Sequence, residues 1–158
     1  MPEVKEVSEG DPAEAVLENA RRKAGAVDAP GALVIGCDTE VVVDGRVLGQ
    51  PGDEAQAREY LELLSGRSHE VLSGLVVAGP EPQKLREGVA RSAVTFRDLG
   101  VVEIDGYLES GEWRDRAGGY AIQGLGSTLA DRIEGELSNV IGLPMGLLVE
   151  LAPELTGS

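Results

Sequence analysis

Residues 32–48 read ALVIGCDTEVVVDGRVL, and this stretch decides the fold class. Its first part, residues 32–36, is a short continuous apolar run, which is typical of a buried strand. The run stops at residues 37–39, so polar groups are predicted at the C-terminal end of the strand. A carboxylate there, Asp38, would lie at the rim of the sheet, where it could hold Mg²⁺ or accept a proton from water. From spacing alone, a structural role of Asp38 in capping a turn is favoured over a catalytic one.

The second part of the same stretch predicts a β-hairpin. Residues 41–43 and 46–48 are apolar or mixed, and Asp44-Gly45 between them is a strong two-residue turn signal. A hairpin interrupts the alternation of strands and helices along the rest of the chain. The sequence therefore predicts an α/β fold with a mixed, twisted sheet and flanking helices.

Two helices flank this region. Asp11 and Pro12 are a helix-start signal, and an apolar stripe then runs to Gly25. A second helix is predicted from Asp53 to Leu64. The remaining prediction consists of strands at 69–77, 92–96 and 127–133, an exposed loop at 79–88, a helix at 102–110, and a last helix from Pro144 to about Leu151.

The composition limits the class of protein. The chain has 158 residues, a formal net charge of −14 and one cysteine, Cys37. This charge repels nucleic acid, so no nucleic-acid partner is expected. A small polyanionic substrate is still compatible with the charge if a divalent cation and nearby cationic side chains screen it. The candidate side chains are Lys23, Arg67, Arg114 and Arg116. Without a signal peptide or an apolar run near ~18 residues, we expect a cytoplasmic protein with no membrane partner.

A glycine-rich string offers a further candidate site. Residues 116–126 read RAGGYAIQGLG, in which backbone can approach a ligand closely and Gln123 can hydrogen-bond a base edge. Such strings are more often only tight turns. The single histidine, His69, opens a strand and is expected to be structural, and Trp113 and Tyr120 are expected in the core. With one histidine and one cysteine, a zinc site is not expected.

Five strings, in order, resemble the Maf family of septum-formation-type nucleotide pyrophosphatases. They are PAEAVLENARRKA, VIGCDTEVVVDGRVLG, LSGRSHEV, AGGYAIQG and IEGELSNVIGLP. Together they cover nearly everything from Asp11 to Leu151, and the resemblance implies one Maf-like domain over residues 1–158. It also implies cleavage of nucleoside triphosphates between the α- and β-phosphates, a divalent cation (Mg²⁺ or Mn²⁺) and a homodimer.

The resemblance also implies roles for individual residues. Asp38 would be the catalytic acidic residue and a metal ligand. A glutamate before the first helix would be a second ligand; Glu6 is the choice, with Glu3 and Glu9 as alternatives. Lys23 would contact phosphate. Thr39 and Gln123 match the branch similar to dTTP/UTP pyrophosphatases, which implies pyrimidine nucleotides as substrates.

Two features depart from the family pattern. The family normally begins with an apolar strand followed by S-x-S-x-R-R, and we expect this N-terminal strand and helix to be missing here. The family's G-K-P string is G-Q-P here, so Gln50 would contact phosphate without a positive charge. Because of these departures, an alternative interpretation stays open: a catalytically impaired, nucleotide-binding regulatory protein linked to cell division.

Overall fold

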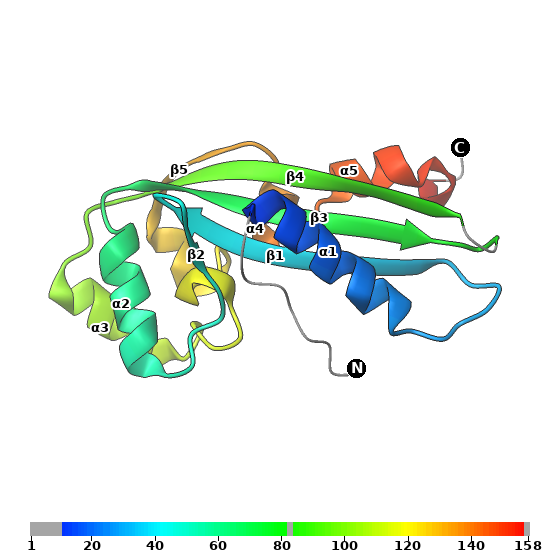
Figure 1. The fold of residues 1–158 in the computed structure, drawn as a ribbon. Coiled ribbons are helices and arrows are strands. Elements are labelled where there is room, and N and C mark those ends of the chain that lie inside the picture. Colours follow the sequence, from blue (N-terminus) through cyan, green and yellow to red (C-terminus); the bar gives the residue numbers. More distant parts are fainter. Residues whose placement is uncertain (1–10, 82–83, 157–158) are drawn as a thin grey trace.

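The computed structural model describes residues 11–81 and 84–156, and in these residues five strands form one sheet (Figure 1). The order across the sheet is β2-β1-β3-β4-β5, and each neighbouring pair is antiparallel. The strands are β1 (Val34–Val43), β2 (Arg46–Leu48), β3 (Ser68–Ala78), β4 (Leu85–Phe96) and β5 (Ala130–Glu134). The predicted α/β class with flanking helices is confirmed, but the sheet, predicted as mixed, is antiparallel throughout the described residues.

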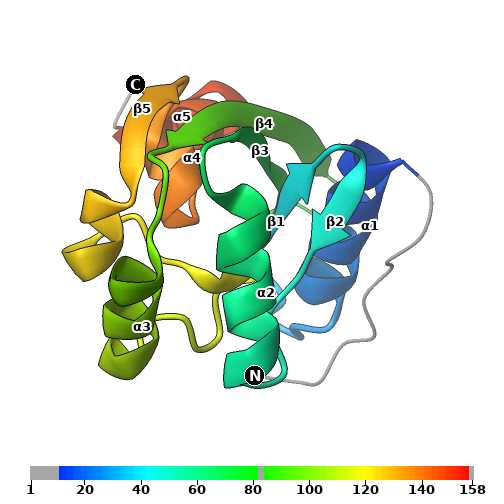
Figure 2. The ribbon, with the colours of Figure 1, turned by 90° about the vertical axis from the view of Figure 1, so that its left-hand side faces the viewer.

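Helices cover the two faces of the sheet unequally (Figure 2). Helix α1 packs on one face, where its apolar residues meet β1 and β3. The other face carries α2, α3 and a series of short turns at one end, and α5 at the other. The helices are α1 (Pro12–Gly25), α2 (Glu54–Leu64), α3 (Val101–Ser110), α4 (Leu137–Ile141) and α5 (Met145–Leu151), with 3₁₀ turns η1 (Ala117–Gly119), η2 (Gly124–Thr128) and η3 (Pro153–Thr156).

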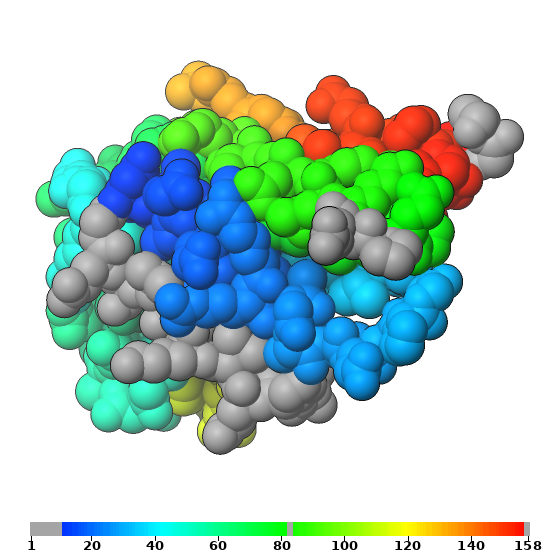
Figure 3. Space-filling model, turned by 45° about the vertical axis from the view of Figure 1, so that its right-hand side comes forward, coloured from blue at the N-terminus to red at the C-terminus, as the bar shows by residue number. Residues whose placement is uncertain are grey.

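Two glycines allow α1 to lie unusually close to the sheet. A Cβ on Gly36 would lie 2.3 Å from the carbonyl oxygen of Ala20, and one on Gly74 would lie 2.4 Å from that of Val16. Both separations are far shorter than van der Waals contact, so only glycine fits. Figure 3 shows the blue surface of α1 lying directly against the green surface of β4, where Arg21 binds Glu87 through two hydrogen bonds.

One edge of β1 is open in the described part of the chain. Strand β2 pairs with Val41, Val42 and Val43 only, whereas β3 pairs along the opposite edge from Val34 to Val42. On the β2 side, residues 34–40 therefore have no strand neighbour among residues 11–81 and 84–156.

The predicted ends of several elements are wrong. Asp38 is not at the end of its strand but in the middle of β1, because backbone pairing with β3 continues through the polar residues. Strand β4 begins at Leu85, inside the predicted 79–88 loop, because its long pairing with β3 does not need an apolar side chain at each position. Strand β5 starts at Ala130 because the preceding residues form η2, and the short α4 was not predicted.

Other predictions are confirmed. Asp11 caps α1 by accepting a hydrogen bond from the Ala13 amide at 3.1 Å. The predicted second helix is present but begins at Glu54, because Asp53 is its cap and accepts a hydrogen bond from the Gln56 amide at 2.8 Å. The hairpin turns at Asp44-Gly45, which both have positive φ. No helix in the described ranges combines the length and apolarity needed to cross a membrane.

Candidate active site

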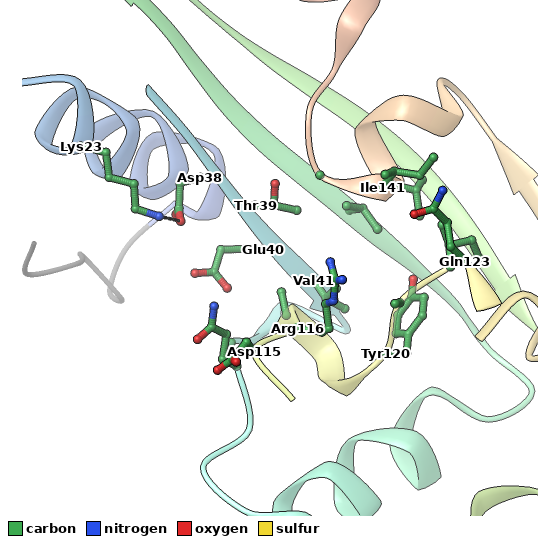
Figure 4. A pocket seen from close by; sticks show the side chains of 18 residues that line it. Lys23, Asp38, Thr39, Glu40, Val41, Asp115, Arg116, Tyr120, Gln123 and Ile141 are labelled. Atoms are coloured by element: carbon green, nitrogen blue, oxygen red, sulfur yellow. Dashed lines mark hydrogen bonds and ion pairs between the residues drawn. The ribbon is translucent and has the colours of Figure 1, made fainter. Parts of the chain in front are cut away.

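A cavity of about 400 Å³ lies at the open edge of β1. Its wall comes from the middle of β1, from the loop between α3 and η2, from α4, and from Lys23 on α1 (Figure 4). Side chains alternate between the two faces of a strand. Asp38 and Glu40 therefore face α1, and Thr39 and Val41 face the opposite side. The cavity lining includes both sets, so side chains from the two faces of β1 contribute to one cavity.

The charged end of the cavity is built on Asp38. This side chain is only 6% exposed, and Lys23 donates from Nζ to its Oδ1 at 2.8 Å. Asn19 donates from Nδ2 to the other oxygen, Oδ2, at 3.1 Å. A carboxylate this deeply buried is stable only with such partners. Because α1 supplies both donors, the close packing of α1 on the sheet fixes the position of the Asp38 carboxylate.

The other end of the cavity is less charged. Thr39 shares a 2.8 Å hydrogen bond between its Oγ1 and the Oγ of Ser73, its neighbour across the β1–β3 pair. Gln123 lies at the start of η2 with an exposed side chain at the cavity wall. Figure 4 shows Gln123, Tyr120 and Ile141 on the Thr39 side of β1, away from Lys23. Hydroxyl, amide and apolar groups of this kind suit a nucleobase better than a phosphate chain.

Glycines shape the loop that closes the cavity. Gly118 and Gly119 both have positive φ, and a Cβ on Gly118 would lie 2.8 Å from Cγ2 of Val41. The Gly118 amide also donates to the carbonyl oxygen of Gly49. The predicted glycine-rich string thus forms tight turns, and those turns also bring Arg116 and Gln123 to the cavity wall.

Below the cavity, His69 fixes the ring of Tyr120. Its Nε2 lies 2.6 Å from the Tyr120 hydroxyl, and both rings pack edge-on against Phe96. His69 is 2% exposed, and burial lowers its pKa to about 4. A neutral His69 is therefore structural, as predicted, and Trp113 lies in the core, as predicted.

This burial predicts a pH-dependent stability. Between pH 6.5 and about 4 the unfolded chain binds a proton at His69 that the folded chain does not, so stability falls as the pH falls through this window. The loss reaches about 3 kcal/mol at the lower end and is absent above pH 6.5. Denaturant unfolding from pH 7.5 to 4 should show that His69→Gln, which does not titrate, loses about 3 kcal/mol less than the wild type. Parallel curves for the two proteins would contradict this.

The thiol beside Asp38 takes no part in this site. Cys37 points to the face opposite Asp38, packs with the apolar residues around α5, and donates to the carbonyl oxygen of Gly142. Burial raises the pKa of the thiol to about 11, so it is not a nucleophile at neutral pH.

The structure brings most of the predicted site residues together. Lys23, Asp38, Thr39, Gln50 and Gln123 all line the cavity. Their functional roles stay predictions. Glu6 lies outside the described residues.

The other candidate cations differ in position. Arg116 lines the cavity, whereas Arg67 pairs with Asp44 in the hairpin and Arg114 lies over the ring of Trp113. Of the candidate cations, Lys23 and Arg116 are therefore at the site, and Arg67 and Arg114 are not.

Sequence reasoning missed several residues of the site. Glu40 and Asp115 line the cavity, and Asn19 and Ser73 lie just behind it, both 0% exposed. One signal was available for Asn19, because it precedes Lys23 by four residues and so shares its helix face. The sequence holds no comparable signal for Ser73, whose place opposite Thr39 depends on the strand register.

Comparisons with known proteins agree with this geometry. The family model described as "Maf-like protein" matches residues 1–155. A dTTP/UTP pyrophosphatase from Pyrococcus furiosus is 41% identical over 147 residues, covering 92% of this chain and 76% of the relative. One from Symbiobacterium thermophilum is 46% identical, covering 96% and 79%, and one from Dictyoglomus thermophilum is 42% identical, covering 98% and 82%. The chain therefore belongs to the Maf-like family.

Proposed function

We propose that this chain hydrolyses nucleoside triphosphates to the monophosphate and pyrophosphate, with dTTP, UTP or modified pyrimidine nucleotides as substrates. The observation that carries the proposal is the buried Asp38–Lys23 pair at the charged end of a cavity of about 400 Å³. That volume suits a small-molecule ligand. The relatives named dTTP/UTP pyrophosphatase support both the reaction and the substrate class.

The cavity's own charge supports a divalent cation as cofactor. Among its described lining residues, Lys23 and Arg116 are cationic, and Asp38, Glu40 and Asp115 are anionic. A triphosphate therefore meets no net positive charge. The carboxylates are hard oxygen donors, which Mg²⁺ and Mn²⁺ prefer.

The donor set fits a cation shared with the substrate. The described residues contain no group of three or more His, Cys, Asp or Glu side chains able to hold a metal. Mg²⁺ commonly uses only one or two carboxylates together with substrate phosphates. Asp38 would be the ligand here, and Glu6 is proposed as a second. When bound, the cation would screen the phosphate charge.

The chain's own residues account for the remaining chemistry. Asp38 would orient a water and accept its proton as the oxygen attacks the α-phosphorus. Lys23 lines the cavity and donates to Asp38, and its ammonium group would also contact a phosphate oxygen. Arg116 and the amide of Gln50 would stabilise the departing pyrophosphate.

The base would lie at the opposite end of the cavity. The amide of Gln123 can donate to and accept from a base edge, and Thr39 offers a hydroxyl held in place by Ser73. Thr39 and Gln123 together match the branch similar to dTTP/UTP pyrophosphatases, and dTTP and UTP are the substrates in the names of the relatives.

Product analysis tests the proposal directly. Purified protein would be incubated with Mg²⁺ or Mn²⁺ and a panel of dTTP, UTP, CTP and 7-methyl-GTP. Formation of monophosphate and pyrophosphate, fastest with dTTP and UTP, is expected. A folded protein that binds these nucleotides without consuming them would instead indicate the regulatory alternative.

Gln50 provides a second prediction. Gln50→Lys restores a cation to the cavity wall, and a hydrogen bond to a charged group contributes about 1.5–3 kcal/mol. We expect kcat/KM for dTTP to rise by about ten-fold or more. Leu85→Lys adds the same charge at a position that is 54% exposed and outside the cavity, so it should leave kcat/KM nearly unchanged. Equal rates for the wild type and Gln50→Lys would exclude a phosphate contact at residue 50.

A further inference from the structure

One polar contact behind the cavity is not explained by substrate binding. Asn19 is 0% exposed and does not line the cavity, yet its Nδ2 donates to Oδ2 of Asp38 at 3.1 Å. Lys23 donates to Oδ1 of the same carboxylate. Each oxygen of Asp38 thus has its own donor, and the two donors differ in charge and in access to the cavity.

The fold fixes this arrangement at the level of the backbone. Asn19 and Lys23 are four residues apart and so lie on the same face of α1. That face is held against the sheet by the close approach of α1 at Gly36 and Gly74, and Gly74 pairs directly opposite Asp38. Asn19 is therefore the more rigid donor, since its side chain is short and wholly buried, whereas Lys23 is a long side chain at the cavity wall.

We propose that Asn19 is a positioning residue that fixes the plane of the Asp38 carboxylate for catalysis. This inference rests on the proposed function. A carboxylate has about four lone-pair positions, and the Asn19 bond occupies one of them on the side away from the cavity. When Lys23 turns to a phosphate oxygen, Asn19 still holds Asp38 and keeps the remaining lone pairs directed at the attacking water. Asn19 acts only through Asp38 and touches no substrate.

This role predicts a separation of kcat from KM. Asn19→Leu keeps the side-chain size but removes the donor, so Asp38 can rotate. We expect kcat to fall about 10- to 100-fold, the effect of losing one hydrogen bond to a charged group, with KM for dTTP within about two-fold of the wild type. A residue that only fills the core would not change kcat selectively.

Asn139 provides the matched control. It is also 0% exposed, and its Nδ2 donates to the carbonyl oxygen of Val71 and to Oγ of Ser92, away from Asp38. Asn139→Leu should lower the melting temperature and leave kcat of the folded protein within about three-fold. An equal fall of kcat in both variants, or an unchanged kcat in Asn19→Leu, would overturn the inference.

A second measurement does not depend on the folding of Asn19→Leu. In the NMR spectrum of the otherwise unchanged protein, the side-chain amide protons of Asn19 should move upfield when Asp38→Asn removes the charged acceptor. An unmoved resonance would overturn the contact. Failure of the wild type to hydrolyse any nucleotide would overturn the proposed function instead, so the two failures are distinguishable.

Discussion

Asp38→Asn is expected to lower kcat by at least about 10²-fold, because asparagine can neither accept the proton of the attacking water nor carry the charge that binds a cation. The side chain keeps its size and one acceptor oxygen, so Asn19 or Lys23 retains a partner. The fold should therefore persist, with a melting temperature lowered by the loss of one of the two hydrogen bonds. Single-turnover rates with dTTP, together with circular dichroism, measure both effects.

The hairpin of β1 and β2 supplies a control with the same chemical change. Asp44→Asn also exchanges a carboxylate for an amide, but Asp44 is exposed at the turn and pairs with Arg67 at the surface. Asparagine tolerates the positive φ of that position, and exposed ion pairs contribute little. Full activity in Asp44→Asn with none in Asp38→Asn would assign the loss to the site. Retained activity in Asp38→Asn would exclude Asp38 as the catalytic group.

The sequence was sufficient for elements whose signals are local. The Asp11 cap and the Asp44-Gly45 turn each depend on a few adjacent residues, and the structure confirms both. Asp38 shows where this reasoning ends. A polar residue after an apolar run predicted the end of a strand. Strand β1 nevertheless continues, because Asp38 pairs with Gly74 of β3, 36 residues further along the sequence.

The candidate site was predictable only in part, for the same reason. Motif resemblance identified Lys23 and Gln123, which lie 100 residues apart and come to one cavity. Asn19 and Ser73 were not identified, because each acts on a neighbour across a helix–sheet or strand–strand contact. Such contacts depend on the register of the strands and on the distance between helix and sheet. Neither can be predicted from the spacing of residue types along the sequence.

The distance between α1 and the sheet gives the second large prediction. A Cβ on Gly74 would lie 2.4 Å from the carbonyl oxygen of Val16 and 2.6 Å from the amide nitrogen of Leu17, and both atoms belong to the backbone of α1. No side chain can rotate away to relieve such a contact, so Gly74→Ala must push the whole helix outward. We expect the free energy of unfolding to fall by about 3 kcal/mol, at the upper end of typical overpacking costs. Denaturant unfolding measures this loss.

The same displacement should reach the site, because the helix that moves carries both donors to Asp38. We expect kcat of the folded Gly74→Ala protein to fall, which a merely destabilised protein with an intact site would not show. Gly106→Ala is the matched control: it lies within α3, and a Cβ there meets nothing within 4 Å. Since alanine favours helix over glycine by up to about 1 kcal/mol, this variant should be slightly more stable and fully active. Equal stability of the two variants would mean that α1 can move away from the sheet at little cost. The close approach of α1 at Gly74 would then not be what keeps Lys23 and Asn19 in contact with Asp38.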